Sequence, residues 1–540
     1  MPSPCAAAVL LLLLLLLQAP PPCKPVAAPA PTLATACGAL SGVVTQLPYS
    51  GEPAFRYANI PYAAPPTGPL RFRPPQPPPQ CPWAGVRDGS LATPACVQPS
   101  GSGSEDCLYL TVSTPANHSA AADAPLPGLV YFHGGNLISG APAGAGLDVL
   151  AVRTPGQLVA VGVHYRLNML GFLATADLAA EAGWVGNQGV ADAIAALQWV
   201  QASIGAFGGD ASRVTIAGQS SGGTLIFSLF ASPSAAGLFT GALSMSGSPN
   251  ITQGAAAKQA QDARVVAALG CASPPTPAAR VACLRALNAS TLARATGSTS
   301  PSWGTPGIFG WGLPAGIPAP PAGEAYAGIV HVDGALVTLP FHEALAARTV
   351  PAALIISNME AEGGGSGDAI GALNATYQQW QALLAASFPA AAWGAGAGAA
   401  AAAAIDAAYR AEGQLSPDLA YNSINSDYGL TCAARAVAAR VQAANASRAG
   451  APLYLLYNAW QRGAWRPSGA GQWPYRECGG APSEGGALLS RRSTRALTHL
   501  SRRPPTRPLF SKLPLLLRRP RFSGNVLGVG GRLHPHRPGL

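Results

Sequence analysis

The sequence predicts an α/β fold in which helices cover both faces of a mostly parallel sheet. Short apolar runs typical of buried strands alternate along the chain with longer helical stretches. This is the pattern of parallel strands joined by helical crossovers. In addition, 49% of the 540 residues are hydrophobic, so the chain can bury a substantial core as one large domain or two.

The expected elements follow from these runs in chain order. Strands are predicted over 126–135, 158–167, 213–218, 352–357 and 452–460, the first of them running into a glycine turn. Residues 190–208 have the spacing of an amphipathic helix. The segment 222–232 is expected to form the beginning of a second helix. The alanine-rich stretch 390–413 is predicted to be a surface helix.

One serine lies between two glycines where a predicted strand meets a predicted helix. Within RVTIAGQSSGGTL, residues 213–225, the segment GQSSG has the G-x-S-x-G pattern of a nucleophile elbow. Gly218 and Gly222 would let the strand and the helix approach closely. Ser220 would lie at the positive end of the helix, where negative charge developing on a substrate oxygen is favoured. The pattern therefore predicts that Ser220 is a catalytic nucleophile.

A second glycine motif precedes this turn by about 85 residues. The segment YFHGGN, residues 131–136, ends a predicted strand. In a fold with a nucleophile elbow, this position holds the loop whose main-chain N–H groups form part of an oxyanion hole. An ordinary glycine turn is the alternative interpretation.

The first residues have the pattern of a secretory signal peptide. An apolar run from Cys5 to Leu17 is shorter than the roughly 20 residues that span a bilayer. We expect cleavage between about Ala19 and Ala36 and assign the signal peptide to 1–28. An uncleaved anchor is the alternative, because no Lys or Arg precedes the run. Export also fits five glycosylation sequons, at Asn117, Asn250, Asn288, Asn374 and Asn445. We therefore predict a protein of the secretory pathway or extracellular space, without a stable membrane span.

Cysteine usage indicates an oxidising compartment. Nine cysteines follow Cys5, and none of them forms a C-x-x-C pair. Disulfides are therefore favoured over a metal site, with buried free thiols as the alternative. No metal and no organic cofactor is implied.

The net charge of +10 comes from the C-terminal residues. The stretch 485–540 holds twelve of the 33 Lys and Arg residues and no Asp or Glu, so the preceding chain is close to neutral. A nucleic-acid partner is therefore not expected. Prolines prevent a continuous helix in this stretch, and we expect a disordered tail or the product of a misread exon or shifted frame. A tail that binds polyanions is the alternative.

Six segments together resemble the type-B carboxylesterase and cholinesterase family, which has the α/β-hydrolase fold. They are NIPYAAPPTGPLRF (58–71), SEDCLYLTV (104–112), YFHGGN, VHYRLNMLGFL (163–173), GNQGVADAIAALQWVQASIGAFGGDASRVTIAGQSSGG (186–223) and VDGALVTLP (332–340). The resemblance extends over about residues 37–478, which we assign to one hydrolase domain. The long segment that ends at the elbow is the most specific.

The resemblance implies roles for individual residues. Ser220 would be the acylated nucleophile, and the oxyanion would be held by the main-chain N–H groups of Gly135, Asn136 and Ser221. Asn136 stands where the family usually has glycine. Its N–H donor is retained, while its side chain would narrow the acyl pocket.

The acid of the triad should follow a strand and precede a glycine. Glu360 and Glu362 both follow the strand predicted at 352–357, and the family spacing favours Glu362. A solvated surface carboxylate is the alternative.

Cysteine positions also resemble those of the family. They imply two short disulfide loops, Cys96–Cys107 and Cys271–Cys283. The pairs Cys37–Cys81 and Cys432–Cys478 are further candidates.

The catalytic histidine of the family has no counterpart at its expected place. The family sets it in a loop after the strand resembled by 452–460, but residues 471–490 contain no histidine. Only His499, His534 and His536 follow the acid, all in the basic tail. Loss of a triad histidine slows turnover by up to about a millionfold.

Two functions follow from this pattern. The first is a secreted serine hydrolase that cleaves small-molecule or lipid esters through an acyl-enzyme, inactive in this version if no histidine completes the triad. The second is a non-catalytic cholinesterase-like module for binding or adhesion. The sequence leaves the ester substrate and the oligomeric state open.

Overall fold

The computed structural model of the chain describes residues 32–359 with short gaps, together with several later segments. The gaps are 49, 79–80, 121, 185, 250, 252 and 296–329, and the later segments are 376–387, 396–411, 434, 437–438 and 453–458. The predicted signal peptide 1–28 and the basic tail 485–540 lie outside the described residues.

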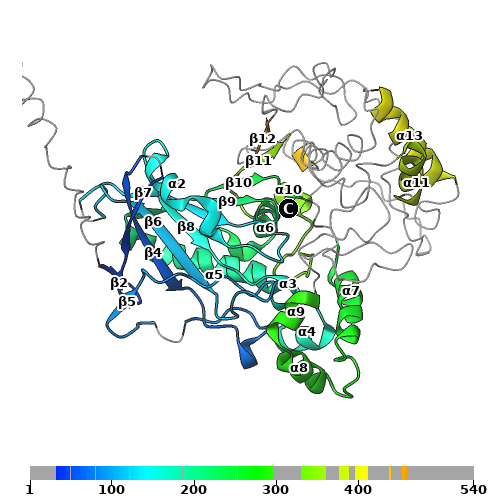
Figure 1. Cartoon of the computed structure of the whole chain (residues 1–540), viewed down its shortest axis with the longest axis horizontal. Helices are drawn as coiled ribbons and strands as arrows, with labels where there is room; N and C mark the ends of the chain where they lie inside the picture. Colours follow the sequence, from blue (N-terminus) through cyan, green and yellow to red (C-terminus); the bar gives the residue numbers. More distant parts are fainter. Residues whose placement is uncertain are drawn as a thin grey trace, which may run out of the picture.

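A nine-stranded mixed sheet forms the centre of the described structure (Figure 1). Its strand order is β12-β11-β10-β9-β7-β8-β6-β4-β3. The six strands from β12 to β8 pair in parallel, and β6, β4 and β3 add antiparallel pairs at one edge. The predicted mostly parallel sheet is therefore confirmed. The strands are β3 (Val43–Gln46), β4 (Pro53–Pro61), β6 (Tyr109–Pro115), β7 (Leu126–Phe132), β8 (Val159–Val163), β9 (Gly209–Gln219), β10 (Gly241–Met245), β11 (Ala353–Met359) and β12 (Leu453–Asn458).

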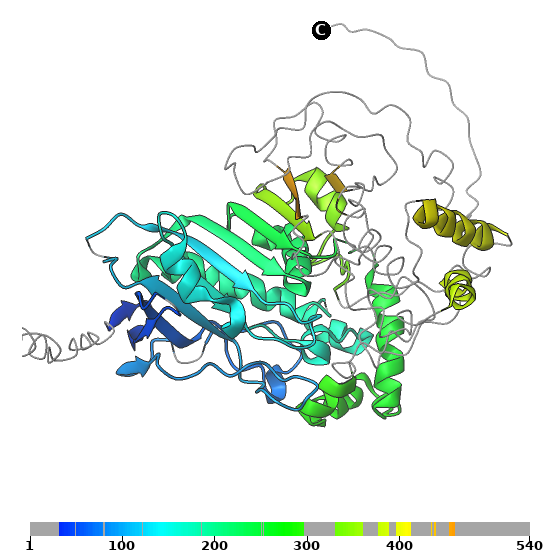
Figure 2. The same cartoon turned by 45° about the horizontal axis from the view of Figure 1, so that its top comes forward.

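The remaining elements surround this sheet. A small separate sheet contains β1 (Leu33–Thr35), β2 (Gly38–Ser41) and β5 (Val86–Asp88). The α-helices are α2 (Leu147–Arg153), α3 (Asn168–Phe172), α4 (Ala176–Ala182), α5 (Gln188–Ser203), α6 (Ser221–Phe230), α7 (Ala255–Ala268), α8 (Pro277–Ala286), α9 (Ala289–Ala295), α10 (Phe341–Ala347), α11 (Tyr377–Ser387) and α13 (Ala397–Ala411). Helices α11 and α13 lie side by side (Figures 1 and 2).

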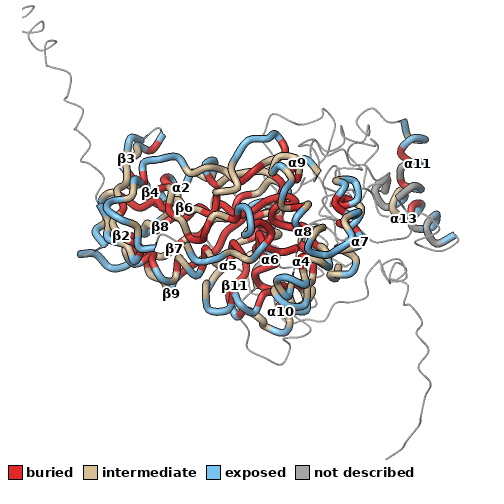
Figure 3. Tube along the Cα trace, turned by 90° about the horizontal axis from the view of Figure 1, so that it is seen from below, coloured by how far each residue is buried: buried red, intermediate tan, exposed pale blue. Residues whose placement is uncertain are grey.

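Alternate side chains of the central strands face opposite sides of the sheet. On β7, Val130 and Phe132 join the main core together with apolar residues of α5 and α6. Leu129 and Tyr131 instead pack in a second cluster with Leu147 of α2. This period of two is the geometry of an extended strand. Helices therefore cover both faces, and the buried positions run through the middle of the molecule (Figure 3).

A separate hydrophobic cluster joins the helices α3, α4, α7, α8 and α9, which we call the helical cluster. Its members include Leu170 of α3, Val265 of α7, Leu284 of α8 and Leu292 of α9. In Figure 1 the helical cluster lies beside the central sheet, below it in this view.

The predicted and observed bounds differ at several elements. The strand predicted at 158–167 ends at Val163, so the prediction was wrong for 164–167. Those residues remain buried, but the main-chain N–H of Arg166 donates to the Asp192 carboxylate at 3.0 Å instead of to a neighbouring strand. The helix predicted at 190–208 begins at Gln188 and, after Ser203, continues as a short 3-10 helix, Ile204–Phe207.

Among the described residues, one helical stretch is long and apolar enough to cross a membrane. It is Gln188–Phe207, and 61% of its apolar window is buried inside the protein. Val190, Leu197 and Val200 of this stretch belong to the main core. The apolar character of this helix is therefore explained by its packing against the sheet.

Candidate active site

The predicted elbow serine lies at the junction between β9 and α6. Ser220 is half-buried and has φ 55° and ψ −125°, a backbone conformation that non-glycine residues rarely adopt. Its N–H donates to the carbonyl of Met245 at 2.8 Å, and its carbonyl accepts from Thr224 N–H at 3.1 Å. Such a conformation costs about 1–3 kcal/mol and persists only where its surroundings hold it. Here the end of β10 and the first turn of α6 hold it.

The glycines around Ser220 permit contacts that no side chain would allow. A Cβ atom added to Gly218 would lie 2.4 Å from the carbonyl carbon of Gly222. One added to Gly222 would lie 2.2 Å from the carbonyl oxygen of Phe132. Strand β9, helix α6 and the end of β7 therefore meet at distances that only glycine permits.

The loop after β7 lies against the elbow. A Cβ atom added to Gly134 would be 3.1 Å from Ser220 Cβ and 2.7 Å from the carbonyl oxygen of Gln219. The next two residues have left-handed backbones, Gly135 with φ 113° and the exposed Asn136 with φ 59°. The segment YFHGGN thus lies beside Ser220, as its position in the sequence predicts.

Hydrogen bonds occupy the carbonyl groups of this loop. Tyr165 Oη donates to the carbonyl of His133 at 2.6 Å, and His133 Nδ1 lies 2.8 Å from the carbonyl oxygen of Gly134. The carbonyl of Gly135 accepts from the N–H groups of the residues three and four positions further on, both at 3.0 Å. In a trans peptide the N–H points opposite to the C=O. The N–H groups of Gly135 and Asn136 therefore point away from these partners.

The three predicted oxyanion donors remain available for a ligand within the described part of the chain. No hydrogen bond between described residues uses the main-chain N–H of Gly135 or Asn136. Ser221 is the first residue of α6, and a helix leaves its first four N–H groups without an intrahelical partner. The dipole of α6 adds partial positive charge at this end.

Two buried histidines, His133 in the loop and His164 after β8, are unsuited to act as the base. Burial lowers the pKa of His133 from 6.5 to about 4. Burial, together with the nearby His133, lowers the pKa of His164 from 6.5 to about 3. The ring of His133 stacks on Tyr165 with 4.5 Å between the ring centroids. A general base works best with a pKa near the working pH, so neither histidine is suited to that role.

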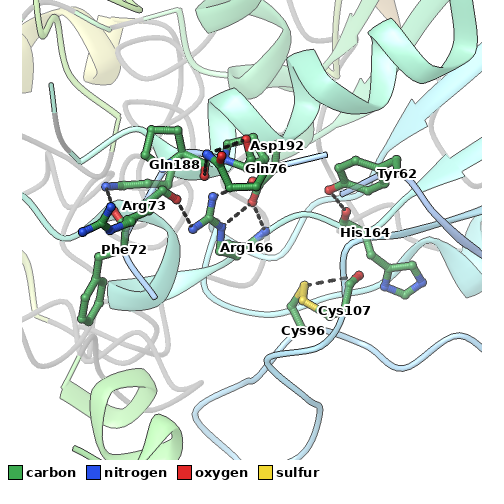
Figure 4. A network of polar contacts seen from close by, with 12 residues as sticks. Tyr62, Phe72, Arg73, Gln76, Cys96, Cys107, His164, Arg166, Gln188 and Asp192 are labelled. Atoms are coloured by element: carbon green, nitrogen blue, oxygen red, sulfur yellow. Dashed lines mark hydrogen bonds and ion pairs between the residues drawn. A yellow bond between two sulfur atoms is a disulfide. The ribbon is translucent and has the colours of Figure 1, made fainter. Parts of the chain in front are cut away.

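A buried ion pair anchors the segment that carries Tyr165. Arg166 Nε and Nη2 donate to the two carboxylate oxygens of Asp192 at 2.8 and 2.7 Å. Arg166 Nη1 also donates to the carbonyl of Arg73 at 2.7 Å, and Figure 4 shows the guanidinium between these two residues. Because Asp192 belongs to α5, the pair ties residues 164–168 to a core helix.

The carboxyl ends of the four parallel strands from β9 to β12 lie on the same side of the sheet. Met245 at the end of β10 pairs in register with Gln219 of β9, and Met359 of β11 pairs with Asn458 of β12. The last residues of β11 and β12 therefore lie at the same end of the sheet as Ser220. The predicted acid Glu362, its alternative Glu360 and the three downstream histidines lie outside the described residues.

The structure contains three disulfides, Cys37–Cys81, Cys96–Cys107 and Cys271–Cys283. Cys432 and Cys478 lie outside the described residues. Over the described ranges, no group of three or more His, Cys, Asp or Glu side chains is arranged to hold a metal ion.

Sequence reasoning missed the residues that support the loop. Tyr165 and Asn168 contact it from a segment about 30 residues away, and the Ser221 hydroxyl contacts it from the elbow. The resemblance of VHYRLNMLGFL to the family was the available signal. That resemblance does not indicate which main-chain group of the loop each of these side chains or N–H groups would bond.

The sheet order and the serine turn between β9 and α6 are those of the α/β-hydrolase fold. The family described as "Carboxylesterase family" matches residues 29–467, and the chain belongs to this family.

Several curated proteins are similar to parts of the chain. Human "Cocaine esterase" is 38% identical over 273 residues, which cover 47% of this chain and 47% of that protein. "Carboxylesterase 3" of Pongo abelii is 42% identical over 248 residues, covering 42% and 41%. "Fatty acyl-CoA hydrolase precursor, medium chain" of Anas platyrhynchos is 37% identical over 276 residues, covering 48% of each. The chain thus spans about half the length of the curated relatives it matches.

Proposed function

We propose that this protein hydrolyses carboxylic esters of small molecules or lipids, with Ser220 as the nucleophile. The observation that carries the proposal is the serine turn between β9 and α6 with the Gly134 loop packed against it. Such an arrangement would aim main-chain donors and a serine hydroxyl at one place, as acyl transfer requires.

The proposed reaction has two halves. Ser220 Oγ attacks the ester carbonyl carbon while a base takes its proton, and the alcohol leaves with a proton returned by that base. A water molecule then attacks the acyl-enzyme, releases the carboxylic acid and regenerates the serine. The N–H groups of Gly135, Asn136 and Ser221 would stabilise the oxyanion in both halves. Glu362 would orient the base.

The base is the unassigned part of this mechanism. Between Glu362 and His499 the sequence contains no histidine. His499, His534 and His536 are the candidates that follow the acid, as the chain order of an α/β-hydrolase triad requires. If none of them reaches Ser220, this version of the protein is nearly inert.

The names of the relatives support acyl-group hydrolysis as the class of reaction. They include a cocaine esterase and a fatty acyl-CoA hydrolase, and both names denote hydrolysis. In this chain, the Asn136 side chain would restrict the size of the acyl group.

We further propose that the protein enters the secretory pathway. The apolar run at Cys5–Leu17, the three disulfides and the sequons support this location. Of the five sequon asparagines, Asn117 and Asn288 belong to the described residues, and both are exposed.

A non-catalytic binding module is the second candidate. The observation in its favour is the missing histidine in 471–490, where the family places its base. In that case the fold and the Ser220 turn would be retained without turnover.

A fluorophosphonate probe, which acylation-competent serines attack, distinguishes the two candidates. We expect the full-length protein to be labelled at Ser220 and to hydrolyse p-nitrophenyl esters. Ser220→Ala should abolish labelling and lower turnover by up to about a millionfold, with an unchanged circular dichroism spectrum. A wild-type protein that is folded but neither labelled nor active would overturn the enzyme and favour the binding module.

A further inference from the structure

The residue after the proposed oxyanion donors has an unfavourable backbone conformation. Leu137 has φ 58°, directly after Asn136 with φ 59°. Asparagine tolerates the left-handed region because its short polar side chain bonds locally, whereas leucine has no such compensation. Leu137 therefore needs contacts that hold it in place.

Both main-chain groups of Leu137 have a partner from another element. Its N–H donates to the hydroxyl oxygen of Ser221 at 3.0 Å, and its carbonyl accepts from the N–H of Asn168 at 2.7 Å. The Leu137 side chain is buried. One residue is thus bonded through its two flanking peptide groups to the first residue of α6 and to the first residue of α3.

Asn168 extends this contact to the neighbouring residues. It is 1% exposed and has φ 50°. Its Nδ2 donates to the carbonyls of Val97 at 2.7 Å and Ile138 at 3.3 Å. If the Asn168 side chain were removed, the buried carbonyls of Val97 and Ile138 would lose this donor.

We propose that Ser221, through its hydroxyl, and Asn168, through its main-chain N–H and the side chain that fixes it in place, are positioning residues that hold Leu137 and thereby aim the N–H groups of Gly135 and Asn136 at the oxyanion. This proposal rests on the proposed ester hydrolysis. We call the two contacts on Leu137 the Leu137 clamp.

The clamp couples the loop directly to the nucleophile. Ser221 follows Ser220 in sequence, so the bond from Leu137 N–H fixes the loop relative to the elbow itself. If Leu137 relaxed to a negative φ, the two preceding peptides would rotate and their N–H groups would turn away. An oxyanion hole depends on donors that are in place before reaction.

The serine contact is tested with Ser221→Ala and the matched variant Ser221→Thr. Both keep the main-chain N–H at position 221, but only threonine keeps a hydroxyl acceptor. We expect Ser221→Ala to lower kcat about tenfold with KM nearly unchanged, a smaller loss than the roughly hundred- to thousandfold effect of deleting an oxyanion donor. Ser221→Thr should restore most of the rate. Equal kcat in all three proteins, or a loss that threonine does not restore, would overturn the role of the hydroxyl.

The asparagine contact is tested with Asn168→Asp and Asn168→Gly. Glycine keeps the left-handed backbone and the N–H that bonds Leu137 but deletes the Nδ2 bonds to Val97 and Ile138 that fix position 168. The N–H would then hold Leu137 less firmly, so kcat should fall while the protein stays folded. Aspartate replaces Nδ2 with an oxygen that faces two carbonyls. Burial raises the pKa of such a carboxyl group, and its protonated form donates again. The activity of Asn168→Asp relative to wild type should therefore rise as the pH falls, and a constant ratio would contradict the proposal.

Amide hydrogen exchange tests the clamp independently of turnover. In wild-type protein the peptide covering residues 133–140 should exchange about fivefold more slowly than in Ser221→Ala, the effect expected for one hydrogen bond. Equal exchange rates would overturn the clamp. If the wild-type protein neither hydrolyses esters nor reacts with fluorophosphonate, the proposed function fails and the exchange rates alone decide whether the clamp exists.

Discussion

The end of the sheet that carries Ser220, here called the sheet edge, and the helical cluster each contain a buried ion pair. The two pairs anchor different segments of the chain. At the sheet edge, Arg166 pairs with Asp192 and anchors the segment whose neighbours Tyr165 and Asn168 hold the loop after β7. In the helical cluster, Lys258 pairs with Asp262 four residues later within α7. Asp262 also accepts the N–H of Ala174 at 2.7 Å.

Both pairs are almost completely buried, with side chains between 0% and 4% exposed. Their contribution to the fold is therefore of the same kind. The difference lies in what the anchored segment touches. Residues 164–168 contact the candidate site, whereas the Lys258 pair joins α7 to the segment between α3 and α4. We therefore expect the same interaction to affect activity in one region and packing alone in the other.

Removing the cation of each pair gives the largest expected effect on stability. Arg166→Met and Lys258→Met each leave a buried carboxylate without its partner, which costs about 3–5 kcal/mol. We expect both variants to unfold at lower urea concentration by similar amounts. Arg166→Met should in addition lower kcat per folded molecule, while Lys258→Met should leave it unchanged. An equal loss of kcat in both would contradict the comparison.

The two regions should also differ in how their stability depends on pH, because the buried, titratable His133 belongs to the loop at the sheet edge. Burial lowers its pKa from 6.5 to about 4. As the pH falls through 6.5, the unfolded chain therefore binds a proton before the folded protein does. This contribution to stability is complete above about pH 6.5 and is lost towards pH 4, by about 3 kcal/mol.

His133→Gln removes this titration and should reduce the decline of the unfolding free energy between pH 6.5 and 4, leaving the part that comes from His164, whose pKa burial also lowers. Urea unfolding at several pH values, compared with wild type, measures the difference. The same slope in both proteins would show that His133 is not the group responsible.

The two short disulfides allow the most closely matched comparison. Cys96–Cys107 and Cys271–Cys283 close loops of 11 and 12 residues, so replacing either pair by alanine should cost a similar amount, about 2.8 kcal/mol. Val97 and Gln98 inside the first loop contact Asn168 and Gly140. Only loss of Cys96–Cys107 should therefore lower kcat. Thermal unfolding and ester hydrolysis of the two double variants test this expectation.

The predictions from sequence succeeded where a short segment carries its own steric reason. The glycines at 218 and 222 predicted a tight strand-to-helix turn, and the close contacts of both positions explain why they are needed. The parallel strands β7, β8, β9, β11 and β12 were found from their apolar runs.

The antiparallel strands β3, β4 and β6 were not assigned from sequence. Most of their residues are not part of a continuous apolar run, and β4 contains an irregularity between Tyr57 and Ile60. Residues 164–167 were assigned to a strand because they directly follow the apolar run 158–163, and the structure shows that they are as buried as strand residues. Burial alone does not distinguish a strand from a loop that bonds to side chains.

The sequence by itself determined the fold class, the family resemblance and the position of the turn at Ser220, because glycine spacing and apolar periodicity are local properties. Only the tertiary structure decided which groups support the serine. Leu137 meets Ser221 across 84 positions and Asn168 from another helix. Such contacts depend on how β7, β8 and β9 lie next to one another, since hydrogen bonds between distant residues form only after the sheet has brought their strands together.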